Sequence, residues 1–284
     1  MYHAGLILEG GGMKGVYTAG VTDFFLDKGI EFDTCYGVSA GAINMVNFIA
    51  KQRERTYRTN TNYVNDKNYC SIYSLIKTGD IFGVDYCYNK IPNELDPYDY
   101  DTYLQYKGKA YAVVTNLETG MPEYMQIKDM KKDMQIIRAS SSLPLVSRNV
   151  KIGGKYYLDG GISDSIPIRK SVEDGNHKNV IILTKETGYR RKPSSQLNLI
   201  KMKYHRYPKI VNAITRRHIK YNKALSYIEM EVAAGRAFVI RPRAELCVKR
   251  LEKDVEKLKL AYKTGYQDAM DSYDRLMAFL EKER

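Results

Sequence analysis

A serine close to the amino terminus has the neighbours of an activated nucleophile. Ser39 lies in the pentapeptide from Gly37 to Gly41, which has the pattern Gly-x-Ser-x-Gly. A run compatible with a strand, residues 31–36, precedes it, and residues 40–50 carry apolar side chains at helical spacing. Small residues on both sides let the chain turn sharply, so that the Ser39 hydroxyl stands exposed at a helix N-terminus. The pattern predicts nucleophilic attack on a carbonyl carbon, with the helix dipole favouring negative charge beside the serine.

A glycine-rich loop nearer the amino terminus could bind that negative charge. The loop reads Gly10-Gly11-Gly12-Met13-Lys14-Gly15 and follows an apolar run that is typical of a buried parallel strand. Because glycine has no β-carbon, the backbone N–H groups of the loop can converge on a carbonyl oxygen. The loop also matches the dinucleotide fingerprint Gly-x-Gly-x-x-Gly, with Glu31 about twenty residues on. A nucleotide-binding protein that uses residues 10–15 as a phosphate loop is therefore an alternative, although its second strand would run straight into the Ser39 turn.

An aspartate followed by two glycines supplies a candidate base. Asp159 ends a predicted hairpin, and Gly160 and Gly161 permit a close approach to it. In a partly desolvated site such a carboxylate can accept the proton of an attacking hydroxyl. The alternative base is His177, which precedes a predicted strand, where the histidine of a triad in the order Ser, Asp, His could lie. The residues by themselves leave both bases open.

The order of these motifs resembles that of the patatin-like phospholipases, and of the bacterial group in particular. The resemblance covers about residues 4–170 in four blocks, Glu9–Gly15, Gly37–Gly41, Ala139–Pro144 and Tyr157–Gly161. It implies a three-layer α/β/α fold with a mainly parallel central sheet. It also implies a Ser–Asp dyad, in which Ser39 is the nucleophile and Asp159 the general base, so that His177 would be an ordinary surface residue.

The resemblance extends to the oxyanion hole and to the substrate. By position, the amides of Gly11, Gly12 and Met13 would bind the oxyanion, joined by that of Ala40. Family members hydrolyse acyl esters of phospholipids and other lipids without a metal. We therefore expect a serine lipid acyl hydrolase of the phospholipase A, lysophospholipase or esterase type with no cofactor, the alternative being a catalytically silent lipid-binding relative. The family usually has Asp where this chain has Glu9, a departure that concerns loop packing more than catalysis.

The elements that must position these residues alternate between strands and helices. Up to residue 50 the pattern predicts strand, glycine loop, helix, strand, serine turn and helix, which favours an α/β fold with a parallel sheet. Further along, the patterns predict strands at 109–115, 122–127 and 179–184, a helix at 129–142 and a hairpin at 151–158.

We expect two regions. Residues 4–172 would form the patatin-like phospholipase domain, in which the polar, Tyr-rich residues at about 51–107 are interpreted as a cap or an insertion. Residues 173–284 would supply the remaining strands and a basic, helical C-terminal extension. Within it the apolar spacing predicts a long helix at 210–228, a last strand at 238–240 and one or two amphipathic helices at 249–283.

Composition and cysteine spacing indicate the cellular compartment in which we expect the protein. The 284 residues are 44% hydrophobic, but they contain no apolar run of about 18 residues and no signal-peptide pattern. The four cysteines are scattered without a CxxC pair, which suits a reducing compartment. We therefore expect a cytoplasmic protein, and the sequence makes no prediction of its oligomeric state.

Nearly all of the net charge of +12 lies in one segment. From Arg190 to Lys223 the chain has eleven Lys or Arg and no Asp or Glu. One hypothesis is that this segment docks the enzyme peripherally on an anionic lipid surface, at the inner face of the membrane. The alternative is a solvated helix face. No RNA- or DNA-recognition signature accompanies the charges, so no nucleic-acid partner is expected.

Overall fold

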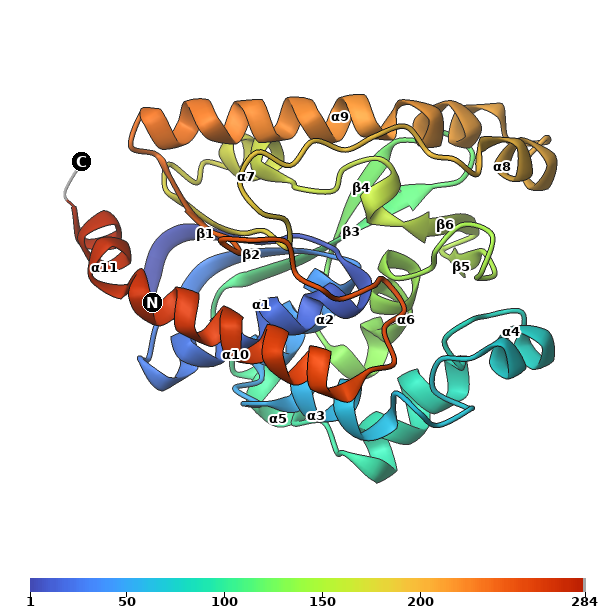
Figure 1. Cartoon of the computed structure of the whole chain (residues 1–284), viewed down its shortest axis with the longest axis horizontal. Helices are drawn as coiled ribbons and strands as arrows, with labels where there is room; N and C mark the ends of the chain where they lie inside the picture. The colour runs from blue at the N-terminus through green and yellow to red at the C-terminus, as the bar shows by residue number, and fades with distance from the viewer. Residues whose placement is uncertain (283–284) are drawn as a thin grey trace.

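An eight-stranded sheet runs through the centre of the protein in a computed structural model that describes residues 1–282 (Figure 1). The strand order is β5-β6-β3-β2-β1-β7-β8, and β4 pairs with β3. The strands are β1 (Tyr2–Leu8), β2 (Phe32–Val38), β3 (Lys109–Asn116), β4 (Pro122–Gln126), β5 (Val150–Ile152), β6 (Lys155–Asp159), β7 (Asn179–Ile182) and β8 (Ala237–Ile240).

The sheet is mainly parallel, as the sequence predicts. Strands β3, β2, β1, β7 and β8 are parallel, whereas β4 and β6 pair antiparallel with β3, and β5 with β6. The predicted hairpin at 151–158 is therefore the β5–β6 pair at one edge. The two strands beyond residue 172, β7 and β8, pair within the same sheet, so the C-terminal region completes it.

Helices and short turns connect these strands. Their bounds are η1 (Gly12–Lys14), α1 (Gly15–Asp27), α2 (Ala40–Ile49), α3 (Arg55–Tyr63), α4 (Ile72–Thr78), the π-helical η2 (Tyr86–Leu95), α5 (Tyr100–Leu104), α6 (Met130–Ser140), η3 (Gly160–Ile162), α7 (Ile168–Glu173), α8 (Leu197–Lys203), α9 (Pro208–Ala233), α10 (Val255–Asp271) and α11 (Tyr273–Glu281). The Tyr-rich segment 51–107 thus forms α3, α4, η2 and α5.

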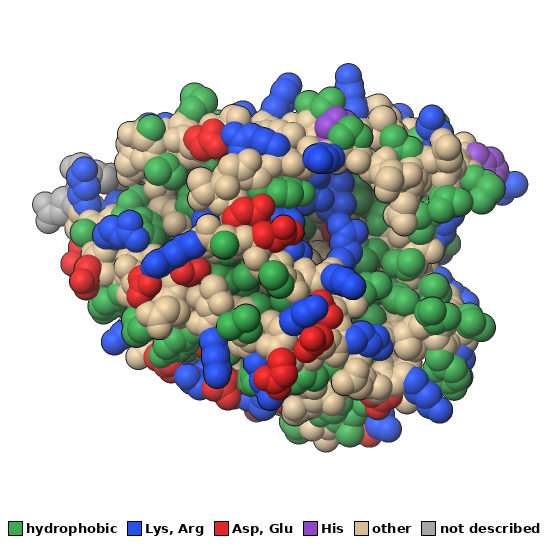
Figure 2. Space-filling view, viewed as in Figure 1, with side chains coloured by type: hydrophobic (Ala, Val, Ile, Leu, Met, Phe, Trp, Pro, Cys, Tyr) green, Lys and Arg blue, Asp and Glu red, His purple; other side chains and the backbone are tan. Residues whose placement is uncertain are grey.

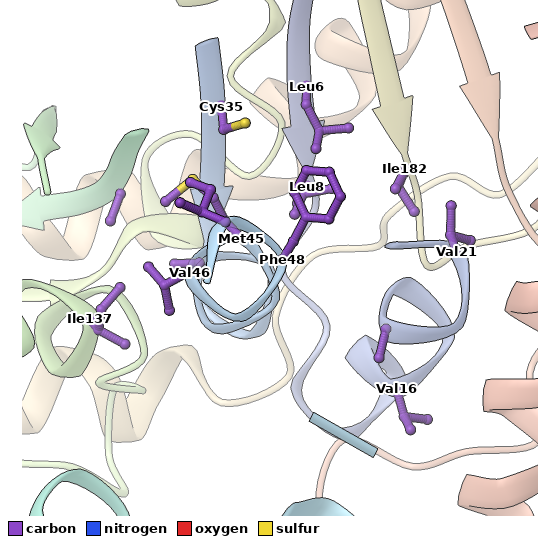
Figure 3. Packing of buried hydrophobic residues seen from close by; sticks show 14 of the residues in the cluster. Leu6, Leu8, Val16, Val21, Cys35, Met45, Val46, Phe48, Ile137 and Ile182 are labelled. Atoms are coloured by element: carbon purple, nitrogen blue, oxygen red, sulfur yellow. The ribbon is translucent and has the colours of Figure 1, made fainter. Parts of the chain in front are cut away.

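Helices cover both faces of the sheet, which gives the three-layer α/β/α architecture. Side chains alternate along a strand, and in β1 Leu6 and Leu8 belong to the large core shared with α1, α2 and α10, as Figure 3 shows in part. Ile7 points to the other face and packs with Tyr221 and Leu225 of α9. In Figure 1, α9 lies along one side of the sheet, and α1, α2 and α10 lie along the other.

The first helix and α10 approach each other closely through two glycines. A Cβ on Gly20 would lie 2.1 Å from the Tyr262 carbonyl oxygen, and one on Gly265 would lie 2.0 Å from the Tyr17 carbonyl oxygen. Gly265 serves this close packing and does not end the helix. Helix α10 continues through Gly265 and ends at Asp271, and Ser272 separates it from α11. The predicted helical segment at 249–283 starts later than expected, since Asp254 caps α10 by accepting from two backbone amides. Residue 283 of that prediction lies outside the described part of the chain.

Candidate active site

Ser39 occupies a strained turn between β2 and α2. Its φ of 55° and ψ of −122° are unusual for a residue with a side chain. The turn needs glycine on both sides, because a Cβ on Gly37 would lie 2.4 Å from the Ala42 Cα, and one on Gly41 would lie 2.2 Å from the Leu8 carbonyl oxygen. This is the geometry of a nucleophile elbow, with the serine side chain at the start of a helix.

The glycine loop packs directly against this turn. A Cβ on Gly10 would lie 3.0 Å from the Ser39 Cβ, and Gly12 has a φ of +59°. The amides of Gly11 and Gly12 donate to no acceptor within residues 1–282. The Met13 amide, by contrast, donates to the Arg250 carbonyl oxygen at 3.0 Å. Of the three amides predicted for the oxyanion hole, two are therefore free in this conformation and one is occupied.

Asp159 ends β6 with its carboxyl group buried. Its Oδ1 accepts from the Gly161 amide at 2.7 Å, and a Cβ on Gly160 would lie 2.1 Å from the Val113 carbonyl oxygen, so the turn requires glycine there. Burial raises the pKa of the Asp159 carboxyl, and the Arg217 guanidinium, the Ser39 hydroxyl and the Gly161 amide oppose that rise. Asp159 and Ser39 line the same cavity.

The end of α6 and the residues just after it hold Ser39 and Asp159 relative to each other. The Ser39 amide donates to the Ser140 Oγ at 2.9 Å, and the Asp159 amide donates to the Ser142 carbonyl oxygen at 2.8 Å. Both hydrogen bonds involve the block Ala139–Pro144, for which the sequence suggested no role. We infer that this block sets the spacing between Ser39 and Asp159.

Two cavities meet at Ser39. The first, of about 150 Å³, is mostly apolar and extends between α2, α6 and the Tyr-rich segment, with Ile43, Tyr69, Phe82, Ile91 and Ile137 in its lining. The second, of about 220 Å³, is polar and contains Asp159. Ser39 lines both, and so do Gly12, Leu143 and Arg250.

Glu9, the residue that departs from the family pattern, is fully buried and hydrogen-bonded. It accepts from the Thr184 amide at 2.7 Å, from the Thr184 hydroxyl at 3.1 Å and from the Tyr221 hydroxyl at 2.6 Å. It therefore joins the end of β1 to the end of β7 and to α9. This confirms that Glu9 belongs to the packing beneath the glycine loop, although nothing in the local sequence identifies its partners.

The histidines lie away from this site. His177 is exposed just before the amino end of β7, whereas Ser39 follows the carboxyl end of β2. Because β2, β1 and β7 are parallel, the two residues lie at opposite ends of these strands. None of the four histidines lines either cavity. Within residues 1–282 no group of three or more His, Cys, Asp or Glu side chains is placed to hold a metal ion.

Two family models match separate parts of the chain. A family model for patatin-like phospholipases matches residues 6–170, and a model for a domain of unknown function, DUF6363, matches residues 207–281. The fold has three α/β/α layers, and the family match shows an ester-hydrolysing enzyme. Since the first match covers more than half of the chain, the protein belongs to the patatin-like phospholipase family.

Two curated proteins and one solved structure align with different shares of the chain. The uncharacterized protein YjjU of Escherichia coli (strain K12) is 27% identical over 274 residues, which are 92% of this chain and 74% of that protein. The probable lipid hydrolase 463L of Invertebrate iridescent virus 6 is 23% identical over 194 residues, which are 63% of this chain and 66% of that protein. The crystal structure of VipD from Legionella pneumophila aligns with 97% of this chain and 67% of that chain, at 16% identity and a TM-score of 0.48.

Proposed function

We propose that the protein is a serine lipid acyl hydrolase in which Ser39 is the nucleophile and Asp159 the general base. The observation that carries the proposal is the position of Ser39, on a strained turn where an apolar cavity meets a polar one that contains Asp159. An acyl ester has the same division, with an apolar chain on one side of its carbonyl group and a polar alcohol on the other. The first cavity would hold the acyl chain.

The reaction would proceed through an acyl-enzyme. Asp159 accepts the proton of the Ser39 hydroxyl while the Ser39 Oγ attacks the ester carbonyl carbon. The tetrahedral intermediate collapses, and the alcohol leaves with the proton that Asp159 held. Water then attacks the acyl-enzyme with Asp159 again as base, which releases the carboxylic acid and restores Ser39. Burial supports this role, because it raises the pKa of the Asp159 carboxyl and so makes it a stronger base than an exposed aspartate.

The oxyanion would bind to backbone amides beside Ser39. The amides of Gly11, Gly12 and Ala40 have no acceptor within residues 1–282, so they are available to a substrate oxygen. The Met13 amide can join them only if the Arg250 carbonyl gives up its hydrogen bond. We therefore assign the oxyanion hole chiefly to Gly11 and Gly12.

Labelling with a fluorophosphonate probe tests the dyad. Wild type should be labelled at Ser39, Ser39→Ala should not react, and Asp159→Asn should react far more slowly. His177→Ala serves as the matched control and should react as wild type does. Absence of labelling in folded wild type would point to the catalytically silent alternative, and loss of labelling in His177→Ala would overturn the dyad.

We also propose that the basic segment from Arg190 to Lys223 contacts anionic lipid surfaces. Within it, α8 exposes Leu199 at 51% and Met202 at 70%, beside two lysines. Apolar side chains flanked by cations are typical of peripheral lipid contact. Within residues 1–282 no helix combines the length and the apolar character that crossing a membrane requires.

Co-sedimentation with vesicles tests this contact. The protein should sediment with anionic vesicles and much less with neutral ones, and Met202→Ser should weaken that binding. The control is Met230→Ser, since Met230 is 65% exposed but lies near the carboxyl end of α9, outside the basic segment. Equal binding of wild type to both kinds of vesicle would remove the proposal.

A further inference from the structure

The polar cavity beside Ser39 is dominated by positive charge. Its lining includes two acidic side chains, Glu9 and Asp159, and five cationic ones: Lys14, Lys185, Arg191, Arg217 and Arg250. Figure 2 shows Lys and Arg side chains gathered around a hollow beneath α9. A cavity of this size with such an excess of cations is an anomaly, because buried like charges repel each other.

None of these five cations forms a direct ion pair within residues 1–282. None of them lies within 4.0 Å of a carboxylate oxygen in the described part of the chain. The carboxylate of Glu9 is already engaged by Thr184 and Tyr221, and that of Asp159 by the Gly161 amide.

The side chains of Arg191 and Arg217 also lack hydrogen bonds within residues 1–282. The Nε atoms of Arg191 and Arg217 are buried and have no partner within residues 1–282. Arg191 instead stacks on the Tyr221 ring, with its guanidinium carbon 4.1 Å from the ring centroid, which holds the group in place but leaves its N–H donors free. Burial, together with the nearby charges of Arg191 and Arg250, lowers the pKa of Arg217 to about 9.

Unpaired, partly buried guanidinium groups cost several kcal/mol each unless something compensates them. Carboxylate and phosphate oxygens both accept the paired N–H groups of the planar guanidinium fork, but a phosphate monoester carries about −1.5 to −2 charges at pH 7 and so compensates more of the five cations. A quaternary ammonium or primary amine in the same cavity would be repelled by all five cations.

We propose that this cavity binds the phosphate of the substrate's alcohol part, so that the preferred substrates are acyl esters of a small phosphorylated alcohol that carries no cationic group. This inference rests on the proposed function, since Ser39 must act on an ester group that lies where the two cavities meet. With the acyl chain in the apolar cavity, the alcohol and its phosphate extend toward Arg191 and Arg217. A lysophosphatidate has this form, whereas a choline or ethanolamine phospholipid does not.

The inference also gives a role to the C-terminal third of the chain. Arg217 lies on α9 and Arg250 in the segment between β8 and α10, and both fall within the DUF6363 match. The phosphate site would thus be built mainly from residues outside the patatin-like match, while the nucleophile, the base and the glycine loop lie inside it.

The test compares two soluble substrates of equal, short acyl length: a 1-acylglycerol 3-phosphate and the corresponding 1-acylglycerol. Wild type should prefer the phosphate ester in kcat/KM by about tenfold or more, as expected for charge-assisted hydrogen bonds. Arg191→Gln and Lys185→Gln should lower kcat/KM for the phosphate ester, through KM, by a much larger factor than for the neutral ester, and so remove most of that preference. The matched control is Arg216→Gln. This substitution removes the same charge, but Arg216 is exposed and lies outside the cavity. Equal loss on both esters, or no loss on the phosphate ester, would overturn the proposal.

Direct binding separates this inference from the proposed function. Ser39→Ala should bind an ether-linked 1-alkylglycerol 3-phosphate, which cannot be hydrolysed, more tightly than 1-alkylglycerol in calorimetry, and Arg191→Gln should abolish the difference. If wild type hydrolyses neither ester but this difference persists, the phosphate site stands and the catalytic proposal fails. If inorganic phosphate alone binds as tightly as the ether lipid, the cavity is a general phosphate site and the substrate assignment is wrong.

Discussion

The backbone amide of Met13 donates a hydrogen bond to the carbonyl oxygen of Arg250 at 3.0 Å. This contact joins the glycine loop after β1 to the segment between β8 and α10, 237 positions further along the chain. Arg250 also lines both cavities. The C-terminal region therefore lies against the proposed oxyanion hole and shapes the space around Ser39.

Gly12→Ala should damage the site through this contact. A Cβ on Gly12 would lie 2.6 Å from the Arg250 carbonyl oxygen, and the φ of +59° is itself unfavourable for alanine. We expect the rate of fluorophosphonate labelling to fall by about tenfold or more, as when one oxyanion donor is misplaced. Gly153→Ala is the control, because Gly153 has a φ of +53° but nothing within 4 Å of the added Cβ. Equal labelling rates in the two variants would argue against an oxyanion role for the loop.

Acid should inactivate the enzyme at a higher pH than an ordinary aspartate would require. Burial raises the pKa of Asp159, and the base must be ionised to accept the Ser39 proton. The labelling rate should therefore decline as the pH falls through this raised pKa, above the value of about 3.9 for a free aspartate. Arg217→Gln removes the cation that most opposes the rise, so its acid limb should move to still higher pH, whereas that of Arg216→Gln should stay in place. An unchanged limb in Arg217→Gln would show that Asp159 is not the titrating group.

Glu9→Asp should destabilise the protein even though the family usually has Asp there. Glu9 reaches Thr184 with one carboxylate oxygen and Tyr221 with the other. A side chain one methylene shorter cannot reach both, so a buried polar group loses its partner. The free energy of unfolding should fall by about 1–3 kcal/mol. Chemical denaturation measures this, with the exposed Glu118→Asp as control, and similar stabilities of the two variants would contradict it.

Gly265→Ala should loosen the contact between α1 and α10. The added Cβ would lie 2.0 Å from the Tyr17 carbonyl oxygen, which is backbone and cannot rotate away. Although alanine favours the helix, we expect a net loss of about 1–3 kcal/mol in unfolding free energy from overpacking. Lys263→Ala, two residues earlier on the exposed face of α10, should be nearly neutral in the same denaturation experiment. A Gly265→Ala variant as stable as wild type would show that the two helices separate easily.

Much of the scaffold follows from local patterns. Buried parallel strands are apolar on both faces, so runs such as Gly5–Leu8 and Asn179–Ile182 stand out in the sequence. The turn around Ser39 needs small neighbours for steric reasons, and that requirement is visible as Gly37 and Gly41. The spacing of Ile210, Ile214, Tyr221, Leu225 and Ile228 likewise predicts the buried face of α9.

Other features depend on which distant residues meet, and no local pattern encodes that. The partners of Glu9 come from positions 184 and 221, and the block that links Ser39 to Asp159 comes from α6. The Tyr-rich segment gives weak periodicity because its short helices pack around an apolar cavity and do not lie on a regular face.

The basic segment illustrates the difference most directly. In the sequence, Arg191, Arg216 and Arg217 are equivalent members of one run of positive charge, and counting them suggests a single charged surface. Only the packing of α9 against the sheet decides that Arg216 faces solvent while Arg217 turns toward Asp159. A helix places adjacent residues about 100° apart, so one faces water and the next enters the cavity. The sequence by itself therefore determined the serine turn, its glycine loop and the kind of sheet that holds them, and the tertiary structure decided which charges line the cavity beside Ser39.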